Sequence, residues 1–479
     1  MKKLVTLLLA AGMVFSAANG ASAVEMKVSG SWLTSFTFAD NLFGENALVK
    51  DSDEGTFNAA QRIRINFDMV ASESLSGRVQ LQVANGGDAP QYYTWGTAGV
   101  GGTGKYAVTA RLAYLDWMVP TTDVLVRMGR QEVTTPSYTF GSPILDTPVD
   151  GVLVNAPIND MVGVTFGWLR PSAKLNKWGE AHTAHGSADL AYLAVDVAAD
   201  GFKVTPWGMV GLVGSNAAQT VVKDENGGRL GANPTLDMFG WGVDGLDTRT
   251  TVYWVGIGGE LTMFDPFKFT ADFLYSGNDA DHWAERKGWY AALGAEMKTS
   301  FATPFLRGWY ASGDDADSED SGRMITVNDG GAFDASSTYF DANGLLAATI
   351  DKCNPGGTWG VQLGVKNVSF VEDLTHALSV TYFQGTNNTN RVSDPAMRAR
   401  LGKVVDDAAN GNWSVQGPVG YMTTSDSAWS IDFLSSYKLY QNLTANVLLS
   451  YLVTDYDESL WGQDYENGFR GTLNFTYAF

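Results

Sequence analysis

Eighteen segments of this sequence alternate polar and apolar residues with a period of two, the pattern of a strand that is wet on one face and apolar on the other. In the segment 62–69, Arg62, Arg64, Asn66 and Asp68 share one face and hydrophobic residues take the other. Because the segment 151–156 is weak, sixteen strands is the alternative count. The segments lie at 24–38, 62–69, 78–83, 106–118, 123–130, 151–156, 161–169, 189–198, 202–212, 250–263, 266–276, 287–299, 301–311, 358–370, 374–385, 427–438, 441–453 and 466–479.

The connections between these segments alternate in length throughout. Long and short connections on opposite rims are typical of outer-membrane β-barrels, whereas a compact soluble domain rarely contains structureless loops of such length. We therefore expect an all-β fold, a transmembrane antiparallel β-barrel. The short connections include 119–122, 264–266 and 440–442, and the long ones include 213–249, 312–357 and 386–426.

The first 23 residues have the pattern of a secretory signal. Lys2 and Lys3 precede an apolar run at 4–15, and small residues at 21–23 supply a cleavage pattern. No later stretch approaches the 18 or more consecutive apolar residues that a spanning helix needs. We expect a signal peptide at 1–23 and a single barrel domain at 24–479, which crosses a membrane with strands.

Composition excludes several classes of function. The formal net charge is -20, or -22 without Lys2 and Lys3, which argues against nucleic-acid binding. Cys353 is the one cysteine, so no internal disulfide can form. The 54 glycines and 12% aromatic residues suit tight turns and the aromatic girdles of a barrel.

The last nine residues alternate with few exceptions. Leu473, Phe475, Tyr477 and Phe479 fall on one face, and small or polar residues fall on the other. A terminal Phe with aromatic residues two and four positions before it resembles the C-terminal signature of bacterial outer-membrane β-barrels. The resemblance implies that this strand closes the barrel against the first strand and that the barrel-assembly machinery binds it.

A second resemblance rests on the segments 110–117 and 124–131, Ala-Arg-Leu-Ala-Tyr-Leu-Asp-Trp and Val-Leu-Val-Arg-Met-Gly-Arg-Gln. They are similar to the trimeric general porins, in which an Arg-hydrophobic-Ala-aromatic strand precedes a short turn and a strand ending in Gly-Arg. Over essentially the full mature length, the pattern also resembles the outer-membrane homotrimeric porins of sulfate-reducing bacteria.

The porin resemblance implies an inward-folded constriction loop at 131–150 and a homotrimer in the bacterial outer membrane. Arg64 and Arg130 would be basic wall residues, and Asp146 and Asp150 would be the opposing carboxylates. The chain departs from the general porins in its count of eighteen strands and in lacking the Pro-Glu-Phe-Gly-Gly motif of that loop.

The arginines carry a physical argument of their own. A charge on the lipid face costs about 2–4 kcal/mol at the midplane, so arginines opposite an apolar face should point into the lumen. Guanidiniums that face carboxylates across a narrow opening create a transverse field that filters ions by charge. The alternative is that these arginines pair with carboxylates such as Asp68 and brace the wall. The candidate lumen residues are Arg62, Arg64, Arg78, Arg111, Arg127, Arg130, Asp146 and Asp150.

Strict alternation cannot aim both Arg127 and Arg130 inward, because they are three residues apart. We therefore expect a bulge at Gly129 if both line the lumen.

Acidic residues are concentrated at 314–320 and 455–458. One interpretation is a solvated loop tip. The other is divalent-cation binding, with Ca²⁺ either bridging the loops to lipopolysaccharide or ordering the loops. No other cofactor is expected.

The sequence predicts a porin for passive diffusion of small hydrophilic solutes. A surface barrel that adheres through its long loops and a barrel enzyme are the alternatives. No Ser/His/Asp arrangement stands out, and Cys353 has no evident base beside it. The run 99–105 matches a phosphate-binding loop except that Tyr106 replaces the Ser or Thr that would hold Mg²⁺.

Overall fold

The structure of this protein is a computed structural model. It describes residues 24–42, 48–50, 55–85, 92–97, 99–100, 106–173, 187–214, 221–223, 229–232, 250–279, 285–316, 320–327, 333–340, 354–393, 421–462 and 464–479. The expected signal peptide, 1–23, and Cys353 lie outside these residues.

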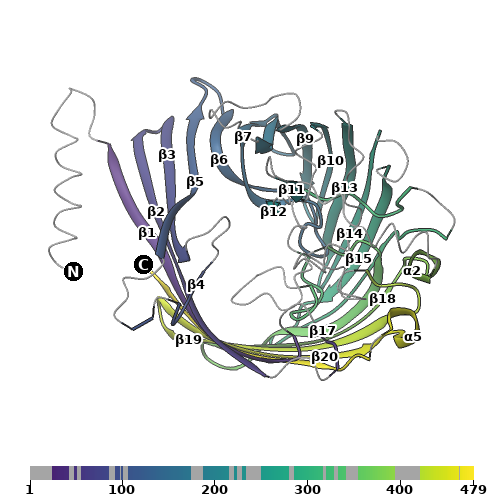
Figure 1. Ribbon diagram of the computed structural model, residues 1–479. Coiled ribbons are helices and arrows are strands. Elements are labelled where there is room, and N and C mark those ends of the chain that lie inside the picture. Colours follow the sequence, from purple (N-terminus) through teal and green to yellow (C-terminus); the bar gives the residue numbers. More distant parts are fainter. Residues whose placement is uncertain are drawn as a thin grey trace.

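Among the described residues, eighteen strands form one closed antiparallel barrel (Figure 1). Each strand pairs with its neighbours along the chain, and β1 pairs with β21. The barrel strands are β1 (Glu25–Asp40), β2 (Thr56–Ser72), β3 (Leu75–Asn85), β5 (Tyr106–Met118), β6 (Leu125–Thr134), β7 (Asp146–Pro157), β8 (Val162–Ala173), β9 (Ser187–Ala199), β10 (Phe202–Val213), β13 (Thr250–Phe264), β14 (Phe267–Asn278), β15 (Lys287–Met297), β16 (Thr303–Ala311), β17 (Thr358–Val371), β18 (Leu374–Gly385), β19 (Ser427–Tyr440), β20 (Leu443–Asp455) and β21 (Gly468–Ala478).

Three short strands and two short helices lie outside the eighteen barrel strands. The two-residue strand β4 (Tyr93–Thr94) pairs with β2, and β11 (Val221–Lys223) pairs with β12 (Arg229–Ala232) in a separate hairpin. Two short helices, α2 (Asn390–Ser393) and α5 (Glu458–Trp461), lie in long connections. Among the described residues no helix is long and apolar enough to cross a membrane.

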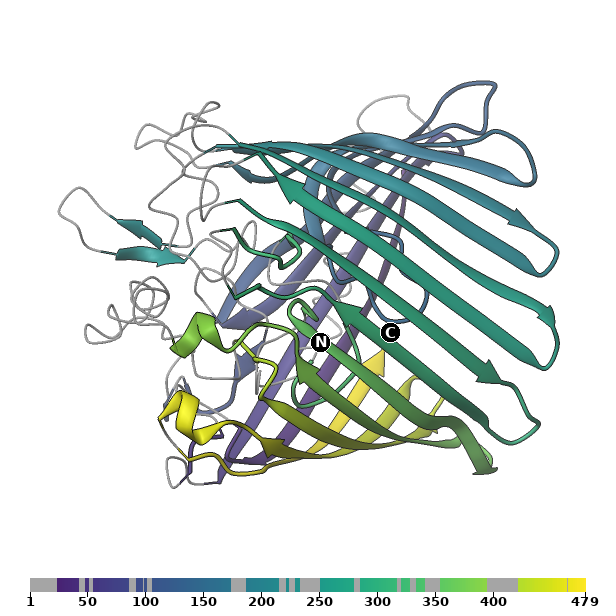
Figure 2. The same cartoon turned by 90° about the vertical axis from the view of Figure 1, so that its right-hand side faces the viewer.

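The structure confirms the predicted eighteen strands. The segment 151–156, whose alternation is weak, lies within β7. It also confirms the alternation of the connections. Tight turns gather at one rim and long connections at the other (Figure 2). The β17–β18 turn is an example, where Asp373 adopts the left-handed region at φ 62°.

The outer surface is apolar and carries two aromatic rows. On β16, Leu306 is 50% exposed outside the barrel while Trp309 is 4% exposed inside it. At the loop side, neighbouring rings contact one another, as in Trp289 and Tyr310, whose centroids are 4.8 Å apart. Such belts mark the two interfaces of a bilayer. The loop-side row is Tyr253, Tyr275, Trp289, Tyr310, Trp359, Tyr382, Trp429 and Tyr451, one from each strand from β13 to β20.

The seam between β1 and β21 confirms the predicted closing strand. The ladder runs from Ser31 opposite Ala478 to Asp40 opposite Phe469, with Leu473, Tyr477 and Phe479 exposed outside. Beyond it, Gly30 N donates to Phe479 O at 2.7 Å and Phe479 N donates to Gly30 O at 3.0 Å.

We predict that Phe479→Ala lowers the yield of folded barrel several-fold without changing the conductance of the barrels that form. The ring of Phe479 covers Gly30, where a Cβ would lie 2.6 Å from it, so its loss uncovers the last turn of the seam. Heat-resistant mobility on gels measures the folded fraction. Phe301→Ala, which removes an exposed aromatic ring far from the seam, is the control. Equal yields of the two variants would show that the seam does not need this ring.

Candidate functional site

The hairpin formed by β6 and β7 leaves the barrel wall and enters the lumen. Its two strands pair with each other up to Thr134 opposite Asp146. The pairing of β6 with β5 ends at Arg130, and the pairing of β7 with β8 ends at Asp150. Beyond that point the hairpin curves into the ring of strands (Figure 1). The inward segment predicted at 131–150 is therefore present, but only its tip, 135–145, lacks strand structure.

No bulge occurs at Gly129. Its φ is +123°, yet the register of β6 against β5 and β7 continues without a shift. Alternation therefore holds, and Arg127 and Arg130 face opposite sides of the wall. Arg127 Nε donates to Asp116 on the lumen side at 2.7 Å, and Arg130 Nη1 lies 3.1 Å from Asp150 Oδ2 on the outward side.

A carboxylate on the wall holds the tip of the hairpin. Asp272 of β14 is buried and accepts hydrogen bonds from Tyr138 N at 2.8 Å and Thr139 N at 2.7 Å. The Tyr138 hydroxyl also lies 2.7 Å from Thr205 Oγ1 on β10. Two backbone donors without regular sheet partners are satisfied in this way, so the tip has a defined place in the lumen.

A second inward segment, part of the connection between β16 and β17, follows the same principle. Ser337 N donates to Asp432 of β19 at 3.2 Å, and Arg470 of β21 donates to Ser337 O at 2.8 Å. Ile325 N donates to Ser276 Oγ at 2.9 Å. Buried strand side chains thus pin both inward segments to the inner wall.

The two segments contact each other and form one packed body. Val327 N donates to Ile144 O at 2.9 Å, and the rings of Phe140 and Phe333 are 4.8 Å apart. These rings belong to a continuous apolar cluster with the inner faces of β9, β10, β13–β16 and β18. This side of the barrel interior is therefore a hydrophobic core.

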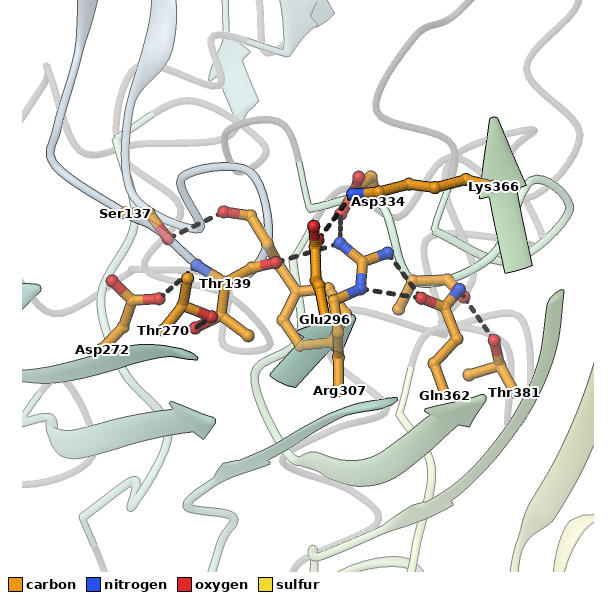
Figure 3. A network of polar contacts seen from close by, with 12 residues as sticks. Ser137, Thr139, Thr270, Asp272, Glu296, Arg307, Asp334, Gln362, Lys366 and Thr381 are labelled. Atoms are coloured by element: carbon orange, nitrogen blue, oxygen red, sulfur yellow. Dashed lines mark hydrogen bonds and ion pairs between the residues drawn. The ribbon is translucent and has the colours of Figure 1, made fainter. Parts of the chain in front are cut away.

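Arg307 of β16 ties this body together, as Figure 3 shows. Its guanidinium donates to Thr139 O of the first segment at 3.0 Å and lies 3.3 Å from Asp334 of the second. It also donates to Gln362 of β17 at 2.9 Å. Sequence reasoning missed Arg307 because its contacts come from residues far apart in the chain.

The opposite wall carries a cluster of guanidiniums, Arg62 and Arg64 on β2 and Arg111 on β5. Arg64 Nε donates to Gln82 at 2.8 Å, and Arg111 donates to Gln80 at 3.1 Å. The ladder between β3 and β5 shifts by one residue at Arg111, and this bulge turns a side chain of outward parity into the lumen.

Glu132 of the hairpin faces this cluster. It lies 2.7 Å from Arg111. Because the hairpin bends inward, the face that is outward at Arg130 turns toward the β2–β5 wall at Glu132. Asp146 shares that face and accepts from Thr134 at 2.6 Å. Among the described residues, no carboxylate pairs with Arg62 or Arg64.

Four further ion pairs join charges of the inner wall across strands. Each pair joins side chains near the tight turns, as the bracing interpretation expects. The pairs are Asp68 with Arg78 at 2.6 Å, Asp116 with Arg127 at 2.7 Å, Glu260 with Lys268 at 2.7 Å and Glu296 with Lys366 at 2.6 Å.

The structure thus separates seven of the eight predicted site residues into three groups, and the eighth, Asp146, lies on the hairpin face that also carries Glu132. Arg62, Arg64 and Arg111 lie together in the lumen. Arg78 and Arg127 are lumen residues that brace the wall. Arg130 and Asp150 pair with each other at the bend, instead of facing one another across an opening. Sequence reasoning missed Glu132, whose only signal was its polarity within the inward segment. The role of these residues in a constriction stays a prediction.

The acidic connections are more ordered than a solvated loop tip. Asp314 is buried and accepts from Ser321 and Tyr421, each at 2.6 Å. The buried Arg391 donates to the carbonyls of Asp315 and Asp320. Residues 317–319 lie outside the described part. In the described part no three metal-ligating side chains come together, and Ca²⁺ binding stays a prediction.

The second acidic stretch, 455–458, runs from the end of β20 to the first residue of helix α5. Asp457 is its N-cap and accepts from Leu460 N at 3.0 Å. Hydrogen bonds from the Ser459 hydroxyl and this amide lower the pKa of Asp457. This carboxylate therefore has a local structural role.

No protein-family model and no curated protein matches the sequence. Solved structures do match the fold. Pseudomonas aeruginosa OccK2 (OpdF) in complex with glucuronate has a TM-score of 0.54 and 10% identity, covering 95% of this chain and 98% of that chain. OpdK with vanillate, from the same organism, has a TM-score of 0.53 and 8% identity over 95% and 98%. OccD3 (OpdP) has a TM-score of 0.51 and 11% identity over 96% and 93%.

The comparison shows the fold. The chain is an 18-stranded β-barrel of the outer-membrane type, similar in structure to these Occ proteins. A closed barrel with an apolar belt is suited to span a bilayer.

We predict that Asp272→Ala loosens the hairpin tip while the barrel stays folded. Two buried amides lose their acceptor, at about 1–3 kcal/mol each, so hydrogen exchange at Tyr138 and Thr139 should accelerate at least tenfold. Asp68→Ala, which removes a lumen carboxylate of β2 that pairs with Arg78 of β3, should leave this exchange unchanged. Unchanged exchange in Asp272→Ala would mean that other contacts hold the tip.

Proposed function

We propose that this protein forms a water-filled channel for passive diffusion of small hydrophilic solutes and ions across a bacterial outer membrane. The observation that carries the proposal is the guanidinium cluster of Arg62, Arg64 and Arg111 on one wall of the lumen, facing Glu132 on the inward hairpin. Arg111 and Glu132 lie 2.7 Å apart, so the hairpin contacts the wall at this point. We place the polar passage beside that contact, along Arg62 and Arg64.

The charge balance of this passage favours anions. Three guanidiniums that stay charged at all physiological pH values face one close carboxylate, while the neighbouring wall charges are paired. A carboxylate-bearing solute could replace water at Arg62 and Arg64 through charge-assisted hydrogen bonds. Two of the similar structures were solved with carboxylates, glucuronate and vanillate. We infer that small organic anions are among the solutes.

The resemblance to the trimeric porins, including those of sulfate-reducing bacteria, supports a homotrimer with three separate passages. The aromatic closing strand, with Phe475, Tyr477 and Phe479, supports recognition by the barrel-assembly machinery. The loop-side rim would contact lipopolysaccharide.

We predict opposite shifts in ion selectivity from the two sides of the passage. Arg62→Gln with Arg64→Gln should move the reversal potential across a salt gradient toward cations, and Glu132→Gln should move it toward anions. The shifts should be larger at 0.1 M than at 1 M salt, because the Debye length falls from about 10 Å to 3 Å.

The control is Arg130→Gln with Asp150→Asn, which removes a neutral pair and should leave the reversal potential in place. A shift in this control and none in the arginine or glutamate variants would move the constriction to the bend. A correctly folded barrel that conducts no current in a planar bilayer would favour the surface-protein or enzyme alternative.

A further inference from the structure

A chain of side-chain hydrogen bonds crosses the inner wall and ends on Arg111. Arg111 Nη1 donates to Gln80 Oε1 of β3 at 3.1 Å, and Gln80 Nε2 donates to Asn66 Oδ1 of β2 at 2.7 Å. Asn66 Nδ2 donates in turn to Ser29 Oγ of β1 at 3.3 Å. Each step joins neighbouring strands, so the chain connects β5 to β1.

The direction of this chain is fixed at its Arg111 end. A guanidinium has donors and no acceptor, so Gln80 must turn its carbonyl oxygen to Arg111 and its amide nitrogen to Asn66. The same reasoning then orients Asn66, whose amide nitrogen points to Ser29. Gln80 is 9% exposed, so little water competes for its amide. The chain therefore holds Arg111 in one place on the wall.

Arg111 needs such contacts because its backbone has no ladder partner on β3. It is the extra residue of the bulge, at which the register between β3 and β5 shifts by one. A bulged residue is left unpaired, and the bulge changes the direction of its side chain. Side-chain contacts with Gln80 and Glu132 therefore set the position of this guanidinium.

Gln82 holds a second guanidinium on the same wall. It accepts from Arg64 Nε at 2.8 Å and lies two residues along the same face of β3 from Gln80. Two residues of a strand span about 7 Å, so Arg64 is an alternative partner for the carboxylate of Glu132. Glu132 is instead bound by Arg111, whose Nη2 approaches its two oxygens at 2.9 and 2.7 Å.

We propose that Gln80 is a positioning residue that keeps Glu132 on Arg111 and so reserves Arg62 and Arg64 for small dicarboxylates. These two arginines lie two residues apart on one face of β2, and no carboxylate of the described residues pairs with them. A solute with two carboxylates can bind both guanidiniums at once. If Glu132 turned to Arg64, the net charge of the passage would stay the same but the adjacent pair would be lost. The inference rests on the proposed anion passage and adds its substrate class.

Gln80→Met tests the proposal, because it keeps the length of the side chain and removes the acceptor. The concentration of succinate that halves the chloride current in a planar bilayer should rise about tenfold, since Glu132 can then pair with Arg64. The reversal potential across a salt gradient should stay in place, because no charge is removed. The control is Asn155→Leu, which removes an amide that donates to Thr165 at 3.0 Å near the β7–β8 turn and should leave the succinate concentration unchanged.

A second background separates positioning from a general effect on the wall. In Glu132→Gln there is no carboxylate to redirect, so adding Gln80→Met should leave the succinate concentration unchanged. An equal rise in both backgrounds, or no rise in the natural chain, overturns the proposal. If Gln80→Met fails to fold, Asn66→Leu interrupts the same hydrogen-bond chain one step further away and replaces it in both measurements. A barrel that conducts no current overturns the proposed channel and this inference together, whereas a conducting barrel without the rise overturns this inference alone.

Discussion

Backbone hydrogen bonding is the constraint on which this structure depends, because a bilayer core offers no partner to an unpaired N–H or C=O. A sheet meets that constraint only by closing, and here the closing ladder joins the first strand, β1, to the last, β21. The main chain of Phe479 exchanges both hydrogen bonds with Gly30, so the seam extends to the final residue. The apolar exterior then follows, since each strand shows one face to lipid.

The same constraint explains how the inward segments are held in the lumen. A hairpin that leaves the wall loses ladder partners. Side chains of other barrel strands replace them as hydrogen-bond acceptors. Asp272 and Asp432 each accept backbone N–H groups from an inward segment. The two segments then bury their aromatic rings against the wall, which turns one side of the interior into a hydrophobic core. Polar anchoring sets their position, and apolar packing makes them one body.

The charges of the inner wall form two groups, those that are paired and those that are not. Near the tight turns, four basic side chains lie within 3 Å of a carboxylate on another strand, so these pairs add little net charge to the lumen. At the inward hairpin, Arg62 and Arg64 have no such partner among the described residues, while Arg111 pairs with Glu132. An uncompensated field at a narrow point acts on a solute far more strongly than the same charges spread over a wall.

The sequence by itself determined the barrel. A period of two, repeated eighteen times with alternating loop lengths, specifies the strands, their lumen and lipid faces and the closing strand, because these are properties of local patterning. It also placed the inward segment and the arginines at 62 and 64. Only the tertiary structure decided which charges remain unpaired. The bulge that turns Arg111 inward, the bend that brings Glu132 to it and the pairing of Arg130 with Asp150 depend on register between strands and on where the hairpin leaves the wall. Those features arise from contacts between residues distant in the chain, which the alternation of any single segment does not encode.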